Sequence, residues 1–439
     1  MTSSCDLLII GAGPAGYELA AEASRKGMSV IIIERSLPGG TCLNRGCIPT
    51  KALCRSAQIA LDVREGGAFG VTVDPSAVTL DYARAVERKD EVVTALREGV
   101  AMAIAKARVV IGNARFIDSH MVEVDGETFT APRIVIATGS APASLPIPGA
   151  DLAINSDALL SLSSLPSRIT IIGGGVIGME FASILSAFGC EVTVIEYCKE
   201  ILPPFDKDIA KRLRQALGRR GVNIIVGAAV TAIEPGFTVS YESKGKQLTV
   251  EADAVVMAVG RRPVIPDGAA GIGIESTRRG ITVDASFQTT VPGIYAVGDV
   301  NGICMLAHAA TAQALSIIGE TSDMSVIPAA VFTAPECAMV GLTEEQCKTA
   351  GLDYKSAKSL FRANGKATAM AENDGMVKMI IDASSRRILG CHICGPHAAD
   401  LISEVALAMT AGLPVDALVR TIHAHPTLGE AVQAAARMF

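Results

Sequence analysis

Tryptophan is absent from this sequence of 439 residues, and the other aromatic side chains are scarce, with 6 tyrosines and 11 phenylalanines. Together with 42 glycines, this scarcity is typical of an α/β protein rich in alanine, valine and isoleucine. Hydrophobic residues make up 49% of the chain. That share excludes a disordered protein and provides enough core for about three domains of ordinary size.

Long hydrophobic runs are also missing. None approaches the roughly 18 residues that a membrane-spanning helix needs, and residues 7–10 are too short for the core of a secretion signal. The net charge of −6 argues against a nucleic-acid partner. The 11 cysteines are odd in number and irregularly spaced, which is typical of free thiols in a reducing compartment. We therefore expect a cytoplasmic protein that binds neither membranes nor nucleic acids.

A glycine-rich motif opens the chain. An apolar run at residues 7–10 leads into Gly-Ala-Gly-Pro-Ala-Gly at 11–16, a helical pattern follows, and a second apolar run ends at Glu34. This order of strand, turn, helix, strand and acid is typical of a dinucleotide-binding unit. Its glycines let a pyrophosphate approach the helix N-terminus, and its acid accepts from a ribose hydroxyl.

The same design recurs from residue 169. Gly-Gly-Gly-Val-Ile-Gly at 173–178 follows an apolar run, and the next strand ends at Glu196. Gly173 and Glu196 have the same separation as Gly11 and Glu34. One such motif is weak, but two with equal spacing predict two dinucleotide sites. Each unit closes alike, with an apolar run ending in Gly139 and in Gly260, respectively.

The first unit alone carries a cysteine segment, Gly-Gly-Thr-Cys-Leu-Asn-Arg-Gly-Cys-Ile-Pro-Thr-Lys at 39–51. Pro49 suits the first turn of a helix. That places Cys47 at a helix N-terminus, where the macrodipole favours a thiolate and the pair with Cys42 can cycle between disulfide and dithiol. The alternatives are two buried structural cysteines, or zinc, which is disfavoured because no second Cys/His pair follows at a finger-like distance.

The rest of the chain has recognisable boundaries. Prolines near residues 148 and 266 mark two of them, and residues 81–107 predict a long helix. After residue 326 we expect paired strands at 377–381 and 388–393 and a helix at 401–411. The basic cluster between Lys211 and Arg220 is expected to be a solvated helix face, with a partner-docking patch as the alternative.

With these motifs the chain resembles the flavoprotein disulfide reductases, and among them the dihydrolipoamide dehydrogenases, nearly from end to end. The most specific segments are 39–51, Gly-Asp-Val at 298–300, Met-Leu-Ala-His at 305–308 and His-Ala-His-Pro-Thr-Leu-Gly-Glu at 423–430. The resemblance implies FAD-dependent oxidation of protein-bound dihydrolipoyl groups, with reduction of NAD through a Cys42–Cys47 disulfide. The alternatives are another disulfide reductase of the family, an NADH diaphorase or oxidase, or a mainly structural subunit of a 2-oxoacid dehydrogenase complex.

The implied architecture is α/β, with two Rossmann-like domains and a C-terminal α+β dimerisation domain. Residues 1–147 would bind FAD and carry the redox disulfide, and 148–266 would bind NAD. Residues 267–325 would return to the FAD domain, and 326–439 would form the interface of a homodimer. Since no lipoyl domain precedes the first strand, we expect the lipoyl group to come from a protein of a 2-oxoacid dehydrogenase or glycine cleavage complex.

The resemblance also assigns site residues. Those implied for FAD are Gly11, Gly13, Gly16, Glu34, Lys51, Ala114, Gly139, Asp299 and Ala307. Those implied for NAD are Gly173, Gly175, Gly178, Glu196, Val230 and Gly260; a carboxylate at Glu196 favours NAD, because it would repel the 2′-phosphate of NADP. Those implied for catalysis are Cys42, Cys47, Lys51 paired with Glu180, and His425 oriented by Glu430.

Several of these residues have a plainer interpretation. His425 and Glu430 suit a base and its orienting carboxylate, but also a turn histidine and a helix N-terminal glutamate. In the family, this histidine reaches the disulfide of the other subunit. Arg45, between the cysteines, would stabilise a thiolate if it faced the pair and do nothing if it faced solvent. Cys391, His392, Cys394 and His397 look like a metal cluster, but on a strand residues three apart point to opposite faces, so we predict no metal.

Overall fold

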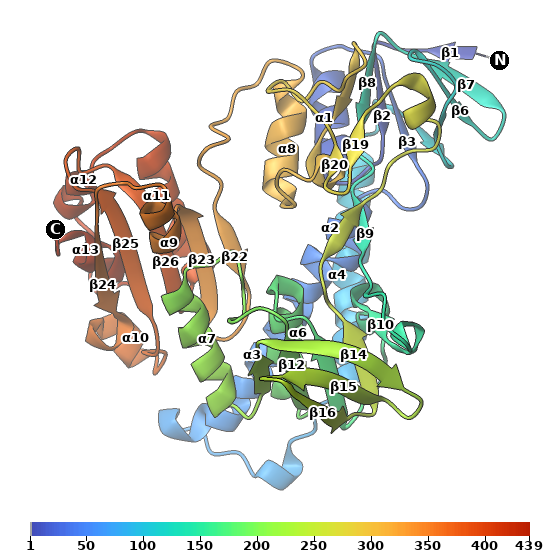
Figure 1. Ribbon diagram of the computed structural model, residues 1–439. Coiled ribbons are helices and arrows are strands. Elements are labelled where there is room, and N and C mark those ends of the chain that lie inside the picture. The colour runs from blue at the N-terminus through green and yellow to red at the C-terminus, as the bar shows by residue number, and fades with distance from the viewer. Residues whose placement is uncertain (1) are drawn as a thin grey trace.

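The computed structural model describes residues 2–439 and consists of three bodies, each built on a five-stranded sheet (Figure 1). The fold is α/β with two similar parallel sheets followed by an antiparallel one, as the sequence predicts.

The first sheet has the strand order β21-β8-β2-β3-β4, with all pairs parallel. Its strands are β2 (Leu7–Ile10), β3 (Val30–Glu34), β4 (Arg108–Ile111), β8 (Arg133–Ile136) and β21 (Ile294–Ala296). Strand β2 is buried along its whole length, as expected for a parallel strand covered on both faces. Helices α1 (Pro14–Arg25) and α8 (Ala307–Ser316) pack side by side on this sheet (Figure 1). A small sheet of β1 (Thr2–Ser4), β7 (Glu127–Thr130), β6 (Met121–Val124) and β5 (Arg115–Phe116) lies beside it.

The second sheet repeats this arrangement with the order β10-β17-β11-β12-β13. Its strands are β10 (Ile154–Asn155), β11 (Arg168–Ile172), β12 (Glu191–Glu196), β13 (Asn223–Val226) and β17 (Ala254–Met257). Helix α6 (Val176–Ala187) follows the glycine-rich turn, and an antiparallel sheet is formed by β14 (Ala228–Glu234), β15 (Thr238–Ser243) and β16 (Lys246–Glu251). The central triplet β17-β11-β12 matches β8-β2-β3 of the first sheet, so the predicted internal repeat is confirmed as a structural repeat. Strands β9 (Ser140–Pro142) and β18 (Arg261–Pro263) pair between the two units.

The cysteine segment forms two helices that the glycine motifs do not predict as separate elements. Helix α2 (Gly40–Arg45) carries Cys42, and α3 (Cys47–Glu65) begins at Cys47, so this cysteine lies at a helix N-terminus as predicted. Helix α3 packs against both α4 (Tyr82–Ala103) and α6. Cys47 therefore begins a helix that contacts both dinucleotide units, and Cys42 lies on the short helix just before it.

The third body contains the order β22-β23-β26-β25-β24, all antiparallel. Its strands are β22 (Ala329–Val331), β23 (Glu336–Gly341), β24 (Tyr354–Leu360), β25 (Met376–Asp382) and β26 (Ile388–Gly395). Its helices are α9 (Glu344–Thr349), α10 (Gly365–Ala369), α11 (Ala398–Thr410), α12 (Val415–Arg420) and α13 (Glu430–Ala436). The paired strands and the apolar helix predicted after residue 326 are confirmed.

Helix α7 (Lys207–Arg219) joins the second body to the third through charged contacts. Lys378 on β25 is 2% exposed, and its Nζ lies 2.9 Å from Asp206 Oδ2, 2.7 Å from Asp208 Oδ2 and 2.6 Å from Glu344 Oε2. Arg212 and Arg219 both contact Asp374 of the third body. The basic stretch of α7, expected to be a solvated face, is thus partly engaged in contacts between bodies.

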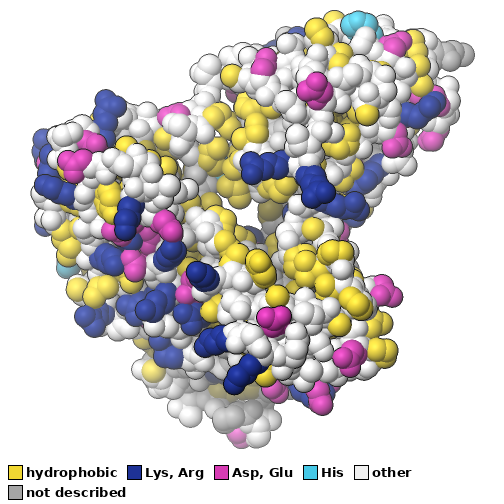
Figure 2. Space-filling model, viewed as in Figure 1, with side chains coloured by type: hydrophobic (Ala, Val, Ile, Leu, Met, Phe, Trp, Pro, Cys, Tyr) yellow, Lys and Arg dark blue, Asp and Glu magenta, His cyan; other side chains and the backbone are white. Residues whose placement is uncertain are grey.

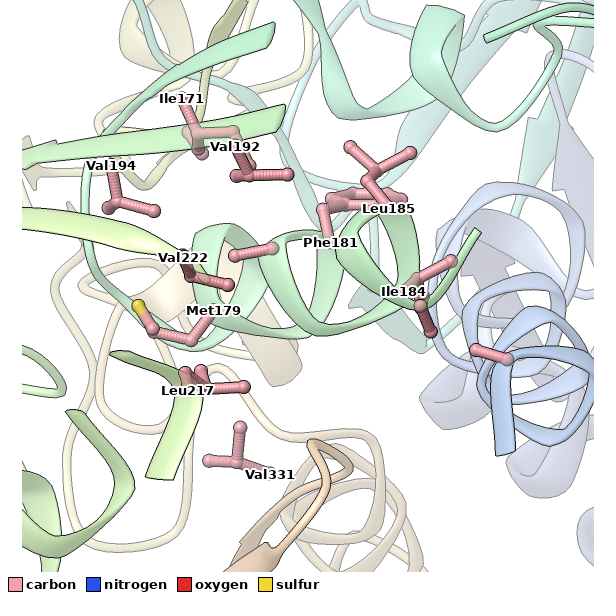
Figure 3. Close-up of a cluster of buried hydrophobic side chains, with 14 of the residues drawn as sticks. Ile171, Met179, Phe181, Ile184, Leu185, Val192, Val194, Leu217, Val222 and Val331 are labelled. Carbon is pink, nitrogen blue, oxygen red and sulfur yellow. The ribbon is translucent and has the colours of Figure 1, made fainter. Parts of the chain in front are cut away.

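A hydrophobic cluster centred on α6 also crosses body boundaries (Figure 3). Met179, Phe181 and Leu185 of α6 pack with Val192 and neighbouring strand residues of the second sheet (Figure 3). The same cluster includes Leu53 of α3 and Val331 of β22, which belong to the first and third bodies. This shared core positions the cysteine helix relative to both sheets.

Candidate active site

A cavity of about 1590 Å³ lies where the two glycine-rich turns, the cysteine helices and α8 meet. In Figure 2 the surface is hollowed between the three bodies, and hydrophobic side chains line the hollow. The cavity is larger than the usual 300–1,000 Å³ of a single small-molecule pocket, which suits a site that takes more than one large ligand.

The first turn is shaped to admit a phosphate group. A Cβ on Gly11 would lie 2.3 Å from Ala137 O, and one on Gly16 would lie 1.9 Å from Gly11 O, so only glycine fits at these two positions. Gly13 has no atom closer than 3.9 Å to such a Cβ, which leaves room for a ligand at the N-terminus of α1. Glu34 accepts hydrogen bonds from Ala12 N (2.8 Å) and Ser36 N (2.9 Å), which fixes its carboxylate at the end of β3.

The second turn repeats this geometry. A Cβ on Gly173 would lie 2.4 Å from Ala258 O and one on Gly178 would lie 2.0 Å from Gly173 O, while Gly175 has nothing within 4 Å. Glu196 accepts from Gly174 N at 2.5 Å and from Cys198 N at 2.6 Å. Both turns therefore have the shape expected of a dinucleotide-binding turn, and each is followed by a strand that ends in a buried acid.

Side chains of the cysteine segment fix its backbone. Asn44 Nδ2 donates to the carbonyl oxygens of Pro38 and Gly40, both at 3.0 Å, and its Oδ1 accepts from Arg97 Nε at 2.9 Å. This network links α2 to α4 and fixes the segment that leads into Cys42. Neither Asn44 nor Arg97 is among the predicted site residues, because their contact depends on a long-range approach of α4.

Cys42 and Cys47 are free thiols that differ sharply in acidity. The hydrogen bond from Cys42 lowers the pKa of Cys47 to about 7 against the opposing effect of burial, and the Lys51 ammonium makes a smaller contribution in the same direction as the hydrogen bond. The same hydrogen bond, together with burial, raises the pKa of Cys42. The pair is therefore set up to share one proton, with the negative charge on Cys47.

Lys51 and Glu180 form an ion pair between the two dinucleotide units. Lys51 Nζ lies 2.8 Å from Glu180 Oε1, which also accepts from the backbone N–H of Phe332 at 3.0 Å. The ammonium also lies 4.5 Å from the centre of the Phe332 ring. Burial opposes the charge on Lys51, but the Glu180 carboxylate raises the pKa of Lys51 overall.

A polar cluster connects the two units at the cavity wall, and only one of its members, Asp299, is among the predicted site residues. Arg261 Nε donates to Ser140 Oγ at 2.7 Å, and Ser140 Oγ donates to Asp299 Oδ2 at 2.5 Å. Ser140 and Arg261 directly follow the equivalent glycines Gly139 and Gly260. In the sequence, Ser140 and Arg261 occupy equivalent positions of the two repeats but differ in residue type. This difference was the signal that could have pointed to them.

Most of the other predicted cofactor residues also line the cavity. These include Ala114, Gly139, Asp299, Ala307, Val230 and Gly260. Ala114 has no positive φ, so its methyl group is compatible with the backbone there. His308 lines the cavity from α8, and its Nε2 lies 2.8 Å from Pro328 O.

The predicted His–Glu pair is formed, but it lies outside this cavity. His425 Nδ1 is 2.9 Å from Glu430 Oε1, and the His425 side chain is 78% exposed. Hydrogen bonds from the Thr427 backbone and then from His425 lower the pKa of Glu430. Within one chain, this pair is not brought together with Cys42 and Cys47.

Arg45 follows neither of its two predicted alternatives. Its Nε lies 3.8 Å from Asp157 Oδ2 of α5 (Ser156–Leu159), so it faces the second dinucleotide unit. Cys391 and Cys394, which look like part of a metal cluster in the sequence, lie on opposite faces of the third sheet. Cys391 packs in one hydrophobic cluster and Cys394 in another. Within residues 2–439, no group of three or more His, Cys, Asp or Glu side chains is arranged to hold a metal ion. Over the same residues, no helix combines the length and hydrophobicity needed to span a membrane.

Comparison with known proteins agrees with this geometry. Residues 5–314 match the pyridine nucleotide-disulphide oxidoreductase family, and residues 327–436 match its dimerisation domain. The chain belongs to this family. It is 39% identical to the dihydrolipoyl dehydrogenase of Geobacillus stearothermophilus and 40% identical to that of Bacillus subtilis, in each case over 99% of this chain and 96% of the relative.

Solved structures of the same family are similar throughout. The HOCl-induced flavoprotein disulfide reductase RclA of Escherichia coli has a TM-score of 0.87 and 33% identity over 99% of both chains. Its Cu(II) complex has a TM-score of 0.88 and 32% identity, with the same coverage. As a pyridine nucleotide-disulphide oxidoreductase, the chain uses FAD and NAD, carries a redox-active cysteine pair and ends in a dimerisation domain.

Proposed function

We propose that this protein is a dihydrolipoamide dehydrogenase, which oxidises dihydrolipoyl groups carried by a protein of a 2-oxoacid dehydrogenase or glycine cleavage complex and reduces NAD. The observation that carries the proposal is the Cys42–Cys47 pair, one thiol acidified and one not, in a cavity shared by two dinucleotide turns. The choice of substrate is inferred from the relatives named dihydrolipoyl dehydrogenase, which are 39–40% identical to this chain.

We assign FAD to residues 1–147 with the returning segment 267–325, NAD to residues 148–266, and dimerisation to residues 326–439. FAD would lie on Gly11, Gly13 and Gly16, with Glu34 at its ribose and Ala114, Gly139, Asp299 and Ala307 along its length. NAD would lie on Gly173, Gly175 and Gly178, with Glu196 at the adenosine ribose and Val230 and Gly260 nearby. When bound, FAD supplies a two-electron carrier between the cysteine pair and the nicotinamide.

The protein's own residues carry out the thiol chemistry. A substrate thiolate attacks Cys42 Sγ of the Cys42–Cys47 disulfide, and the electron pair of the S–S bond leaves on Cys47. The second substrate thiol then displaces Cys42, which releases the substrate as a disulfide and leaves the protein pair reduced. The charge left on Cys47 is stabilised by Cys42 and Lys51.

His425 is the base that these steps require. Its imidazole takes the substrate thiol proton, and Glu430 holds the ring through Nδ1 so that Nε2 is free to act. Since His425 is exposed and outside the cavity of its own chain, we assign it to the cysteine pair of the second subunit in the homodimer.

The test is NAD reduction by dihydrolipoamide with purified, FAD-loaded protein, compared with the Cys42→Ser, Cys47→Ser and His425→Gln variants. Wild type should be active, the cysteine variants inactive, and His425→Gln slowed about a hundredfold or more. Turnover that persists without Cys42, or an absence of turnover in wild type, would contradict the proposal.

A second candidate is a reductase that resembles RclA, which is similar over 99% of both chains. It would use NADH to reduce an oxidised substrate rather than oxidise a dithiol. The structure of an RclA–Cu(II) complex suggests Cu(II) as a probe. NADH oxidation that is faster with Cu(II) than with lipoamide would favour this candidate.

A further inference from the structure

The segment that carries His425 contains a second histidine–carboxylate pair. His423 Nε2 lies 2.9 Å from Glu404 Oε1 of α11. The two histidines differ in environment, because the His423 side chain is 9% exposed and that of His425 is 78% exposed. His423 therefore faces its own chain, whereas His425 faces outward.

Both ring nitrogens of His423 face acceptors. Nδ1 lies 3.1 Å from Thr421 O and Nε2 faces the Glu404 carboxylate. A neutral imidazole has only one N–H. With that N–H on Nε2, the ring donates to the Glu404 carboxylate. This arrangement is a charge-assisted bond, which is stronger and more directional than a neutral one.

His423 contacts the elements that hold the outer pair in place. A Cβ at Gly429, directly before Glu430, would lie 3.2 Å from His423 Cδ2, so the ring packs on this backbone. Thr421 O also accepts from Gln433 Nε2 of α13 at 2.6 Å. His423 also contributes to lowering the pKa of Glu430, after the contributions of Thr427 and His425. Helix α11, the turn at residues 421–429 and the start of α13 are thus all close to the His423 side chain.

We propose that His423 and Glu404 form a positioning pair for His425 and Glu430. Helix α11 supplies a fixed carboxylate, His423 transmits its position to the turn, and the turn holds the outward imidazole at the angle needed to reach a dithiol in the second subunit. This proposal rests on the assignment of His425 as the base. The turn is also held by bonds from Asn364 Nδ2 to Thr427 O and from Thr427 Oγ1 to Ala424 O, and the His423–Glu404 bond adds its link to α11.

The experiment follows the two half-reactions of the FAD-loaded dimer separately under anaerobic conditions, with dihydrolipoamide as one reductant and NADH as the other. In His423→Ala and Glu404→Leu, reduction by dihydrolipoamide should slow about tenfold to a hundredfold, because misplacing a catalytic group by about 1 Å has this effect. Reduction by NADH, which does not use His425, should be unchanged. His423→Gln and Glu404→Gln each retain a hydrogen bond between these positions and should restore much of the rate.

Two results would overturn the proposal: equal loss in both half-reactions together with a lower Tm, which indicates a structural role only, or no loss in either. His425→Gln is the control. If it leaves the dihydrolipoamide half-reaction intact, the base assignment itself fails. If it slows that half-reaction while His423→Ala does not, only the positioning pair fails.

Discussion

The Lys51 ammonium lies 2.8 Å from the Glu180 carboxylate, one turn along α3 from Cys47. The contact joins the helix that begins at the acidified cysteine to a helix of the second dinucleotide unit. It also places two opposite charges near one thiolate, and these charges act on it in opposite directions.

Cys47 should be reactive at neutral pH. Its pKa is lowered to about 7 from an ordinary 9.0. The thiolate form therefore predominates above pH 7 and the thiol form below it. In the reduced FAD-loaded protein, the rate of Cys47 alkylation by iodoacetamide, followed by mass spectrometry of its peptide, should rise with a midpoint near pH 7. Cys42→Ala removes the largest stabilising contribution and should move the midpoint upward. A wild-type midpoint near 9 would contradict this.

Lys51 and Glu180 should shift that midpoint in opposite directions. Lys51 lowers and Glu180 raises the pKa of Cys47. Lys51→Met should therefore move the alkylation midpoint to higher pH, and Glu180→Gln should move it to lower pH. The two variants control for each other, since general damage to the site would move both midpoints the same way. A shared direction would show that electrostatics do not dominate.

Gly175→Ala should separate nucleotide binding from folding. Its Cβ would meet no protein atom within 4 Å, whereas a Cβ at Gly178 would lie 2.0 Å from Gly173 O. Gly175→Ala should leave the Tm unchanged and raise the Kd for NADH about tenfold, equivalent to about 1.4 kcal/mol of lost phosphate contact. Gly178→Ala should lower the Tm instead. Unchanged NADH binding by Gly175→Ala, measured by calorimetric titration, would argue against nucleotide at this turn.

Lys378→Met should destabilise the protein. Removing the buried ammonium leaves Asp206, which is 3% exposed, without its partner, while Asp208 and Glu344 are exposed enough to be hydrated. Loss of one member of a buried ion pair costs about 3 kcal/mol or more. Urea unfolding of this variant should show a lower midpoint. Lys355→Met, an exposed substitution on the neighbouring strand β24, should not. Equal midpoints would mean that the pair contributes no net stability.

Features that depend on local sequence were predictable. Both glycine turns, the start of α3 at Cys47 and strands β25 and β26 of the third sheet follow from residues close together in the chain. Backbone conformation at Gly11 or Gly173 and the helix start near Pro49 are set locally. The family resemblance, carried by longer motifs, also made two residue pairs predictable: Lys51 with Glu180, and His425 with Glu430.

Contacts between residues that are far apart in the sequence were not predictable. Arg261 reaches Ser140 across 121 residues of sequence and Lys378 reaches Asp206 across 172, and neither contact has a periodic or spacing signal. The direction of Arg45 toward Asp157 is likewise set by how the two units pack. One sequence carries no direct information on such relative placement.

The hydrophobic cluster around α6 contains residues from all three bodies. Loosening one body therefore exposes apolar surface on the other two, so heat or denaturant should melt them as a single cooperative unit. A lesion in any one of the three sheets would then lower the melting temperature of the entire subunit, even where it lies far from the cysteines.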